Sequence, residues 1–171
     1  IIISTNIVLI IVEGILVLRI SRLTDYGTVV LVAMLSNKKD LISASELSEI
    51  TDINFPTVSK ILKILYKADI VESVRGINGG YKLIKNAMDI SVADIIDAFE
   101  GPIAITDCSS HKCHCKHESH CSTGLAWQDI NESIRSLLKK ITLADMQDNK
   151  NKNVLPAQFA GMPINIEHQV K

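Results

Sequence analysis

The cysteines are the residues of this 171-residue chain whose type and spacing best suit chemistry. All four lie between residues 108 and 121, interleaved with four histidines: Cys108, His111, Cys113, His114, Cys115, His117, His120 and Cys121. A disulfide framework spreads its cysteines so that they join distant elements, and this cluster does not. Thiolates and imidazoles ligate Zn²⁺, and thiolates also ligate iron–sulfur clusters. The segment therefore predicts a metal site in a reducing compartment, here the cytoplasm.

An enzyme built on this segment is the first alternative. The sequence shows no Ser/His/Asp arrangement, phosphate-cradling glycine loop or carboxylate pair, and C-x-C is not the usual redox motif. We therefore predict that the chain is not an enzyme and takes no small-molecule substrate. Its net charge of −1 is unlike that of a polycation that coats nucleic acid, so DNA binding would need a local basic patch.

Short helices are the elements that would position such a patch. Apolar residues recur at helical spacing from Thr24 to about Ser36. Ser43 and Glu46 form a capping box for a second helix. Leu47 and Ile50 are expected to supply the apolar face of that helix.

A third helix is predicted from Pro56 to Lys67. Its apolar residues form one stripe, made of Val58, Ile61, Leu62 and Leu65. Its remaining residues are largely polar or basic, among them Thr57, Ser59, Lys60, Lys63 and Lys67. Two short helices joined by a short turn, the second with a polar and basic outer face, are typical of a helix-turn-helix.

A β-hairpin is predicted after the third helix, from the β-branched run 70–74, the glycine-rich stretch 75–80 and the strand 81–84. Such a hairpin is the wing of a winged helix. Between Pro56 and Lys85 there are six basic residues and two acidic ones, so this neutral chain is locally positive. The predicted fold class is therefore mainly α-helical with a small β-hairpin wing.

Two more helices are predicted downstream. Ser91 and Asp94 cap the first, which Gly101 and Pro102 end. The second follows the cysteines, from about Thr123 to Lys140, and carries a narrow apolar seam: Trp127, Ile130, Ile134, Leu137 and Ile141. The seam suits helix pairing, either across a dimer or within the domain.

The two ends of the chain have no such pattern. Residues 1–17 are nearly all apolar but lack the basic start and cleavage site of a signal peptide. A spanning helix would need about 20 apolar residues, and Glu13 and Gly14 interrupt this run. We expect no membrane segment but a non-native or disordered extension, with a native start at Val17 or Leu18. The expected parts are then the extension (1–17), the winged helix-turn-helix domain (18–100), a cysteine-rich metal-binding loop (101–123), a dimerisation helix with a short turn (124–146) and a flexible tail (147–171).

These residues together resemble the bacterial iron–sulfur-responsive winged-helix regulators typified by IscR and the nitric-oxide sensor NsrR. The closest resemblance is to the branch that regulates SUF iron–sulfur assembly genes. The matching motifs are LRISRLTDYG at 18–27, TVSKILKIL at 57–65, SVRGINGGYKL at 73–83, the cysteine segment and ITLADM at 141–146. The resemblance implies a transcription regulator, expected to be a repressor, that binds palindromic double-stranded DNA. It also implies a homodimer, whose subunits pair through the long helix after the cysteines.

The resemblance also implies which residues contact DNA. The residues at the start of the third helix would face the major groove: Asn54, Pro56, Thr57, Ser59 and Lys60. Lys63 and the wing's Gly79 are also expected to contact DNA. Arg75 matches the family's wing arginine, which enters the minor groove. The family often has Pro and Gly after the wing's Arg-Gly, where this chain has Ile77 and Asn78.

The implied cofactor is an iron–sulfur cluster, expected as [2Fe-2S], held by three cysteines about five residues apart and one other ligand. Cys115 and Cys121 fit this spacing, and Cys108 completes the preferred set, with Cys113 next in preference. The IscR-type histidine, three residues after the last cysteine, is Gly124 here.

The fourth ligand therefore stays open. Either Cys113 completes the site, or Asp25, which matches the NsrR-type aspartate, reaches across from the partner subunit. Asp25 can equally be an ordinary acidic residue that is favoured at a helix N-terminus. Four cysteines and four histidines can also bind zinc, which leaves a zinc-stabilised DNA-binding protein without redox sensing as the alternative.

Overall fold

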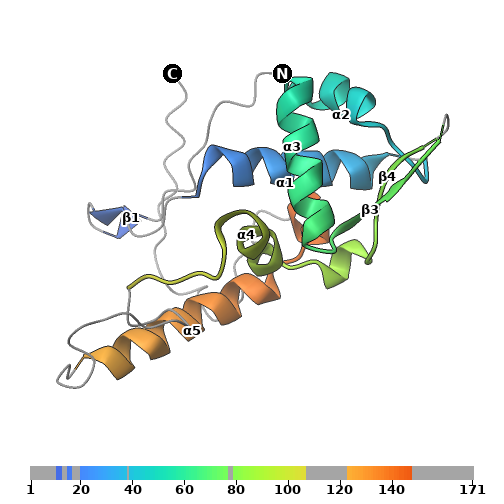
Figure 1. The fold of residues 1–171 in the computed structure, drawn as a ribbon. Coiled ribbons are helices and arrows are strands. Elements are labelled where there is room, and N and C mark those ends of the chain that lie inside the picture. Colours follow the sequence, from blue (N-terminus) through green and yellow to red (C-terminus); the bar gives the residue numbers. More distant parts are fainter. Residues whose placement is uncertain are drawn as a thin grey trace.

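The computed structural model describes residues 11–12, 15–16, 20–37, 39–76, 79–106 and 123–147. Its helices are α1 (Arg22–Ser36), α2 (Ala44–Thr51), α3 (Phe55–Lys67), the short 3-10 helix η1 (Ala87–Asp89), α4 (Val92–Glu100), α5 (Gly124–Lys140) and α6 (Leu143–Gln147) (Figure 1). Its strands form two antiparallel pairs, β1 (Ile11–Val12) with β2 (Ile15–Leu16) and β3 (Val71–Val74) with β4 (Gly80–Leu83). A helix-turn-helix followed by a β-hairpin confirms the predicted winged fold.

Polar caps determine where the helices begin. The Ser21 hydroxyl accepts a hydrogen bond from the backbone N–H of Thr24, so α1 begins at Arg22, two residues before the start that apolar spacing predicts. The two predicted capping boxes are confirmed, at α2 and at α4: Ser43 with Glu46, and Ser91 with Asp94. Gly101, with a φ of 84°, ends α4 as predicted.

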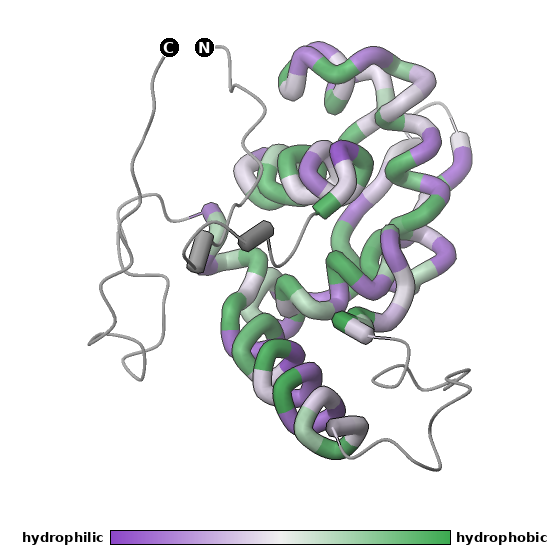
Figure 2. Tube along the Cα trace, turned by 90° about the vertical axis from the view of Figure 1, so that its left-hand side faces the viewer, coloured by the Kyte–Doolittle hydropathy of each residue, from purple (hydrophilic) through white to green (hydrophobic). Residues whose placement is uncertain are grey.

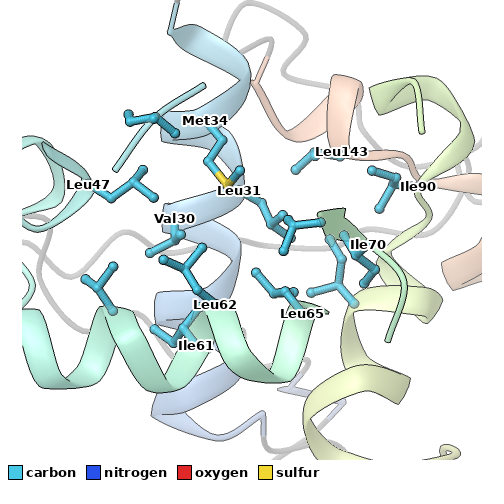
Figure 3. Packing of buried hydrophobic residues seen from close by; sticks show 14 of the residues in the cluster. Val30, Leu31, Met34, Leu47, Ile61, Leu62, Leu65, Ile70, Ile90 and Leu143 are labelled. Atoms are coloured by element: carbon cyan, nitrogen blue, oxygen red, sulfur yellow. The ribbon is translucent and has the colours of Figure 1, made fainter. Parts of the chain in front are cut away.

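The core lies around α1, which contacts α2, α3, α4 and α6 (Figure 3). Its largest buried apolar side chains are all aliphatic: Leu31, Leu47, Ile61, Leu62, Leu65, Ile90, Ile95, Leu143, Val30, Val58 and Val71. The stripe predicted on the third helix is therefore confirmed as the buried face of α3. Leu143 comes from α6, so the chain beyond α5 returns to the same core.

The prediction for Ile50 is wrong. Its side chain is 61% exposed, whereas that of Leu47 is fully buried. The chain turns sharply after α2, at Asp52, which has a φ of 56°. Ile53, directly after this turn, is buried instead and belongs to the core.

The wing is joined to the start of the helix-turn-helix by backbone hydrogen bonds. Strands β3 and β4 pair from Val71 opposite Leu83 to Val74 opposite Gly80. Ile42, just before α2, exchanges two backbone hydrogen bonds with Tyr81 of β4, at N···O distances of 3.1 and 2.8 Å. The hairpin therefore leaves the core in a defined direction relative to α2 and α3.

Helix α5 packs against α4 and extends beyond the rest of the core (Figure 1). The guanidinium of Arg135 donates to both carboxylate oxygens of Asp97 on α4. Figure 2 shows apolar and polar residues alternating along the whole of this helix. Over the described ranges, no helix combines the length and the apolar character needed to cross a membrane.

Candidate nucleic-acid interface and cysteine segment

The outer face of α3 is polar and basic. Pro56, Lys60 and Lys63 are exposed, and Thr57 and Ser59 are half-buried beside them. The sequence of α3 contains no acidic residue. Lys60 and Lys63 form no ion pair with any residue that the structure describes, so their charges face solvent. The structure thus brings the residues predicted for the major groove onto one surface.

Asn54 has a structural role at the start of this surface. Its side-chain oxygen accepts a hydrogen bond from the backbone N–H of Thr57 at 3.0 Å and so caps α3. The same amide carries two N–H donors in addition. Asn54 can therefore hold the helix start and still donate to a phosphate or a base edge.

The wing presents Arg75 directly after β3. Arg75 is exposed and makes no ion pair within the described ranges. Lys82 differs, because its ammonium lies 2.7 Å from the carboxylate of Glu72 on the opposite strand. That hydrogen bond and charge raise the pKa of Lys82. The positive charge of the wing is therefore concentrated near Arg75.

Gly79 shapes the hairpin tip. Its N–H donates to the backbone oxygen of Gly76 at 3.0 Å, and a Cβ at Gly79 would lie 2.3 Å from the backbone oxygen of Val74. A side chain therefore cannot be accommodated without moving the turn. Residues 77–78, where the family motif differs, lie outside the described residues.

All four cysteines, and with them the proposed ligands Cys108, Cys113, Cys115 and Cys121, lie outside the described residues. The one predicted ligand that the structure describes is Asp25, in the first turn of α1. It is half-buried, and burial raises the pKa of its carboxyl group. Among the described residues, none donates a side-chain hydrogen bond to this carboxylate. A partly buried carboxylate of this kind fits a metal ligand and equally fits an acid at a helix N-terminus.

Asn131 is a residue that the sequence reasoning missed. It lies on α5 with 8% of its surface exposed. Its amide donates to the backbone oxygen of Ile103 at 3.0 Å and accepts from the N–H of Ile105 at 3.3 Å. The chain that enters the cysteine segment is thus held against α5. Its position directly after Ile130 of the apolar seam is the sequence feature that could have identified Asn131.

A second connection joins the end of α4 to the start of α1. Thr24 is 2% exposed, and its hydroxyl donates to the carboxylate of Glu100 at 2.6 Å. The same carboxylate oxygen accepts from the backbone N–H of Ser21 at 2.9 Å. Thr24, which directly precedes Asp25, is therefore held against the end of α4, the last helix before the cysteines.

The predicted seam of α5 is only partly covered. Trp127 and Ile130 are 38% and 44% exposed, whereas Ile134, Leu137 and Ile141 are half-buried against the rest of the chain. Leu125, the second residue of α5, is 76% exposed. The C-terminal half of the seam thus packs within the domain, and the N-terminal half carries an apolar surface that no described residue covers.

Comparisons with known proteins give the family. Residues 20–149 match the Rrf2 family, described as iron-dependent transcriptional regulators. The HTH-type transcriptional regulators IscR of Vibrio atlanticus and Vibrio vulnificus are 31% and 30% identical over 149 residues, which is 84% of this chain and 86% and 88% of theirs.

Solved structures agree with this assignment. The structure of T. potens IscR is 29% identical and covers 75% of this chain and 85% of its own, with a TM-score of 0.56. CymR of B. subtilis, titled a global cysteine regulator, is 23% identical over 76% of this chain and 96% of its own, and its TM-score of 0.58 shows a shared fold. The relatives are named as transcriptional regulators, which confirms the prediction that the chain is not an enzyme. The chain belongs to the Rrf2 family of iron-dependent transcriptional regulators.

Proposed function

We propose that this regulator is a homodimeric repressor of iron–sulfur assembly genes that senses an iron–sulfur cluster, [2Fe-2S], bound by its cysteine segment. Cys108, Cys115 and Cys121 are the proposed thiolate ligands, and either Cys113 or Asp25 of the partner subunit is the fourth. A bound cluster supplies chemistry that responds to oxygen, nitric oxide or iron supply. The iron dependence in the family description and the IscR relatives support this proposal.

The observation that carries the proposal is that the described residues on both sides of the cysteine segment are connected to α5. Asn131 holds residues 103 and 105, just before the segment, and α5 begins at Gly124, just after it. A change in how the cysteines are held would therefore act on α5 from both sides. Because α5 is also the proposed dimer helix, such a change would alter the spacing of the two DNA-binding surfaces.

On DNA, each subunit would place the start of α3 in the major groove of one half of a palindromic operator. Arg75 would enter the adjacent minor groove, where a narrow A·T-rich segment attracts a guanidinium. Arg75→Ala is expected to weaken binding most at sites with a narrow minor groove. Equal affinity of this variant and the wild type on every duplex would remove Arg75 from that role.

Anaerobic purification of the full chain tests the cluster. We expect a coloured protein with visible absorbance and with iron and sulfide in equal amounts. Cys121→Ala should remove the colour, while Ser133→Ala, an exposed residue of α5, should keep it. A colourless protein that contains stoichiometric zinc would contradict cluster sensing.

Two single variants separate the candidate fourth ligands. If Cys113 is the ligand, Cys113→Ala should make the cluster labile and Asp25→Asn should not. If Asp25 is the ligand, the outcome should be reversed, and mixed dimers of Asp25→Asn and Cys121→Ala subunits should show ligation across the dimer. The measurement is the rate at which visible absorbance decays in air.

A zinc-stabilised regulator without redox sensing is the second candidate, because four histidines accompany the cysteines. It predicts DNA binding that is indifferent to oxygen and nitric oxide and is lost with a chelator. The sign of regulation is tested separately, by transcription in vitro from an iron–sulfur assembly promoter with the anaerobic protein. Increased transcript would contradict repression.

A further inference from the structure

Phe55 is a large apolar residue at the tip of the proposed recognition helix. It is the first residue of α3, at the end next to α2 (Figure 1), and its side chain is 50% exposed. The buried stripe of the helix begins only at Val58. About half of the Phe55 side chain therefore stays in contact with water, and a partner that covers this apolar surface would gain free energy from its burial.

The helical spacing places Phe55 beside the basic face. Phe55, Ser59 and Lys63 are separated by four residues each, so they share one side of α3. Ser59 is half-buried and Lys63 is exposed. The apolar ring thus lies at one end of a row that leads into the positive surface, and a partner that covers it would also meet that charge.

The two backbone positions directly after Phe55 offer no free hydrogen-bond donor. Pro56 has no N–H, and the N–H of Thr57 is already bound to the side chain of Asn54. The phenyl ring of Phe55 has no hydrogen-bonding group of its own, so any recognition by the ring comes from apolar contact. The N-terminal residues of a recognition helix contact base edges in the major groove, and there the C5 methyl of thymine is the apolar group that the bases offer.

We propose that Phe55 is a specificity-determining residue that reads thymine by covering its C5 methyl group in the major groove. This proposal rests on the DNA-binding role of α3 proposed above. Each subunit would then select a thymine at one position of its half-site, close to the bases that Asn54 and Ser59 face.

The test isolates the methyl group. The full-length chain first selects duplexes from a random-sequence library, and each dT of a selected site is then replaced singly by dU, which lacks only that methyl. We expect one position per half-site at which dU weakens binding about fourfold, the effect of one buried methyl-sized group. Phe55→Ala should bind dT and dU equally at that position.

Tyr66→Ala is the matched control. Tyr66 lies near the other end of α3 and is 54% exposed, so it resembles Phe55 in size and exposure but not in place. This variant should keep the dT-to-dU ratio of the wild type. Phe55→Asn, a second variant without an apolar ring, should lose the ratio, and thermal unfolding of each variant checks that the fold is intact.

The outcomes are distinct. Wild-type protein that binds dU and dT duplexes equally at every position would overturn the proposal. A ratio that survives in both Phe55 variants would also overturn it, because another residue then reads the methyl. A chain that selects no duplex from the library would instead overturn the proposed DNA-binding role of α3, and the Phe55 proposal with it.

Discussion

Two buried polar residues, Thr24 and Asn131, connect segments that are far apart in the sequence. The Thr24 hydroxyl donates to Glu100 and also forms a hydrogen bond with the Ser21 hydroxyl, and the Asn131 amide is bonded to residues 103 and 105. A buried polar group costs free energy unless it is bonded in this way. These two residues therefore fix the chain on the approach to the cysteine segment.

Removal of the Thr24 hydroxyl should affect stability in a pH-dependent way. Hydrogen bonds from Thr24 and then Ser21 lower the pKa of Glu100 below its ordinary 4.5. Their contribution is fully present above pH 4.5 and is lost as the pH falls through the lowered pKa. Thr24→Val should lower the free energy of unfolding at neutral pH by about 1 kcal/mol, modest because Glu100 is exposed.

Urea unfolding as a function of pH measures this effect. The difference between Thr24→Val and wild type should shrink as the pH falls well below 4.5. Thr28→Val is the control, because the Thr28 hydroxyl bonds only to a carbonyl within α1 and should show no such pH dependence. A difference that stays constant down to acid pH would contradict the role of Glu100.

Gly80 allows the wing to approach the segment before α2. A Cβ at this position would lie 2.8 Å from the backbone oxygen of Ile42. Gly80→Ala should therefore destabilise the fold by about 1–3 kcal/mol, measured by thermal or urea unfolding. Ser73→Ala, at an exposed position of the same hairpin, should change stability little. Equal stability of both variants would show that the backbones of residues 80 and 42 can move apart without a measurable loss of stability.

At the scale of elements, the two halves of α5 differ in their surroundings. Its C-terminal half is joined to α4 through Arg135 and Asp97, and its N-terminal half carries the exposed Trp127 and Ile130. An amphipathic helix that leaves a regular apolar seam uncovered is typical of one that pairs with a partner helix. This division supports pairing between subunits through the N-terminal half.

Ile130→Glu should separate the proposed dimer. A carboxylate at this seam position would be placed in an apolar contact without a partner, which is strongly unfavourable. Sedimentation of the variant should give a monomer, while Glu132→Ala, which changes an exposed residue outside the seam, should remain dimeric. A dimeric Ile130→Glu protein with unchanged affinity between subunits would place the interface elsewhere.

At the scale of the whole molecule, a net charge of −1 is distributed unevenly. The positive charge on α3 and near Arg75 faces solvent, whereas Lys82 is offset by Glu72. Only cations that displace counterions from phosphates contribute to the salt dependence of DNA binding. The contribution of each lysine to the salt dependence should therefore depend on whether the fold pairs its ammonium with a carboxylate.

Lys63→Ala and Lys82→Ala test this distribution directly. Lys63→Ala should lower the slope of log affinity against log salt by about 1 if Lys63 contacts a phosphate. Lys82→Ala should change the slope much less, because its charge is already paired with Glu72 at 2.7 Å. Equal changes in slope for the two variants would show that this ion pair opens on DNA.

The sequence by itself determined the features that depend on near neighbours. The caps at Ser43 and Ser91, the buried stripe of α3 and the β-hairpin were predictable because each arises from a spacing of a few residues along one chain segment. The tertiary structure alone decided the exposure of Ile50, the burial of Leu143 and the hydrogen bonds of Thr24 and Asn131. These depend on which distant surfaces meet: Thr24 and Glu100 are 76 residues apart, and no local periodicity encodes that contact.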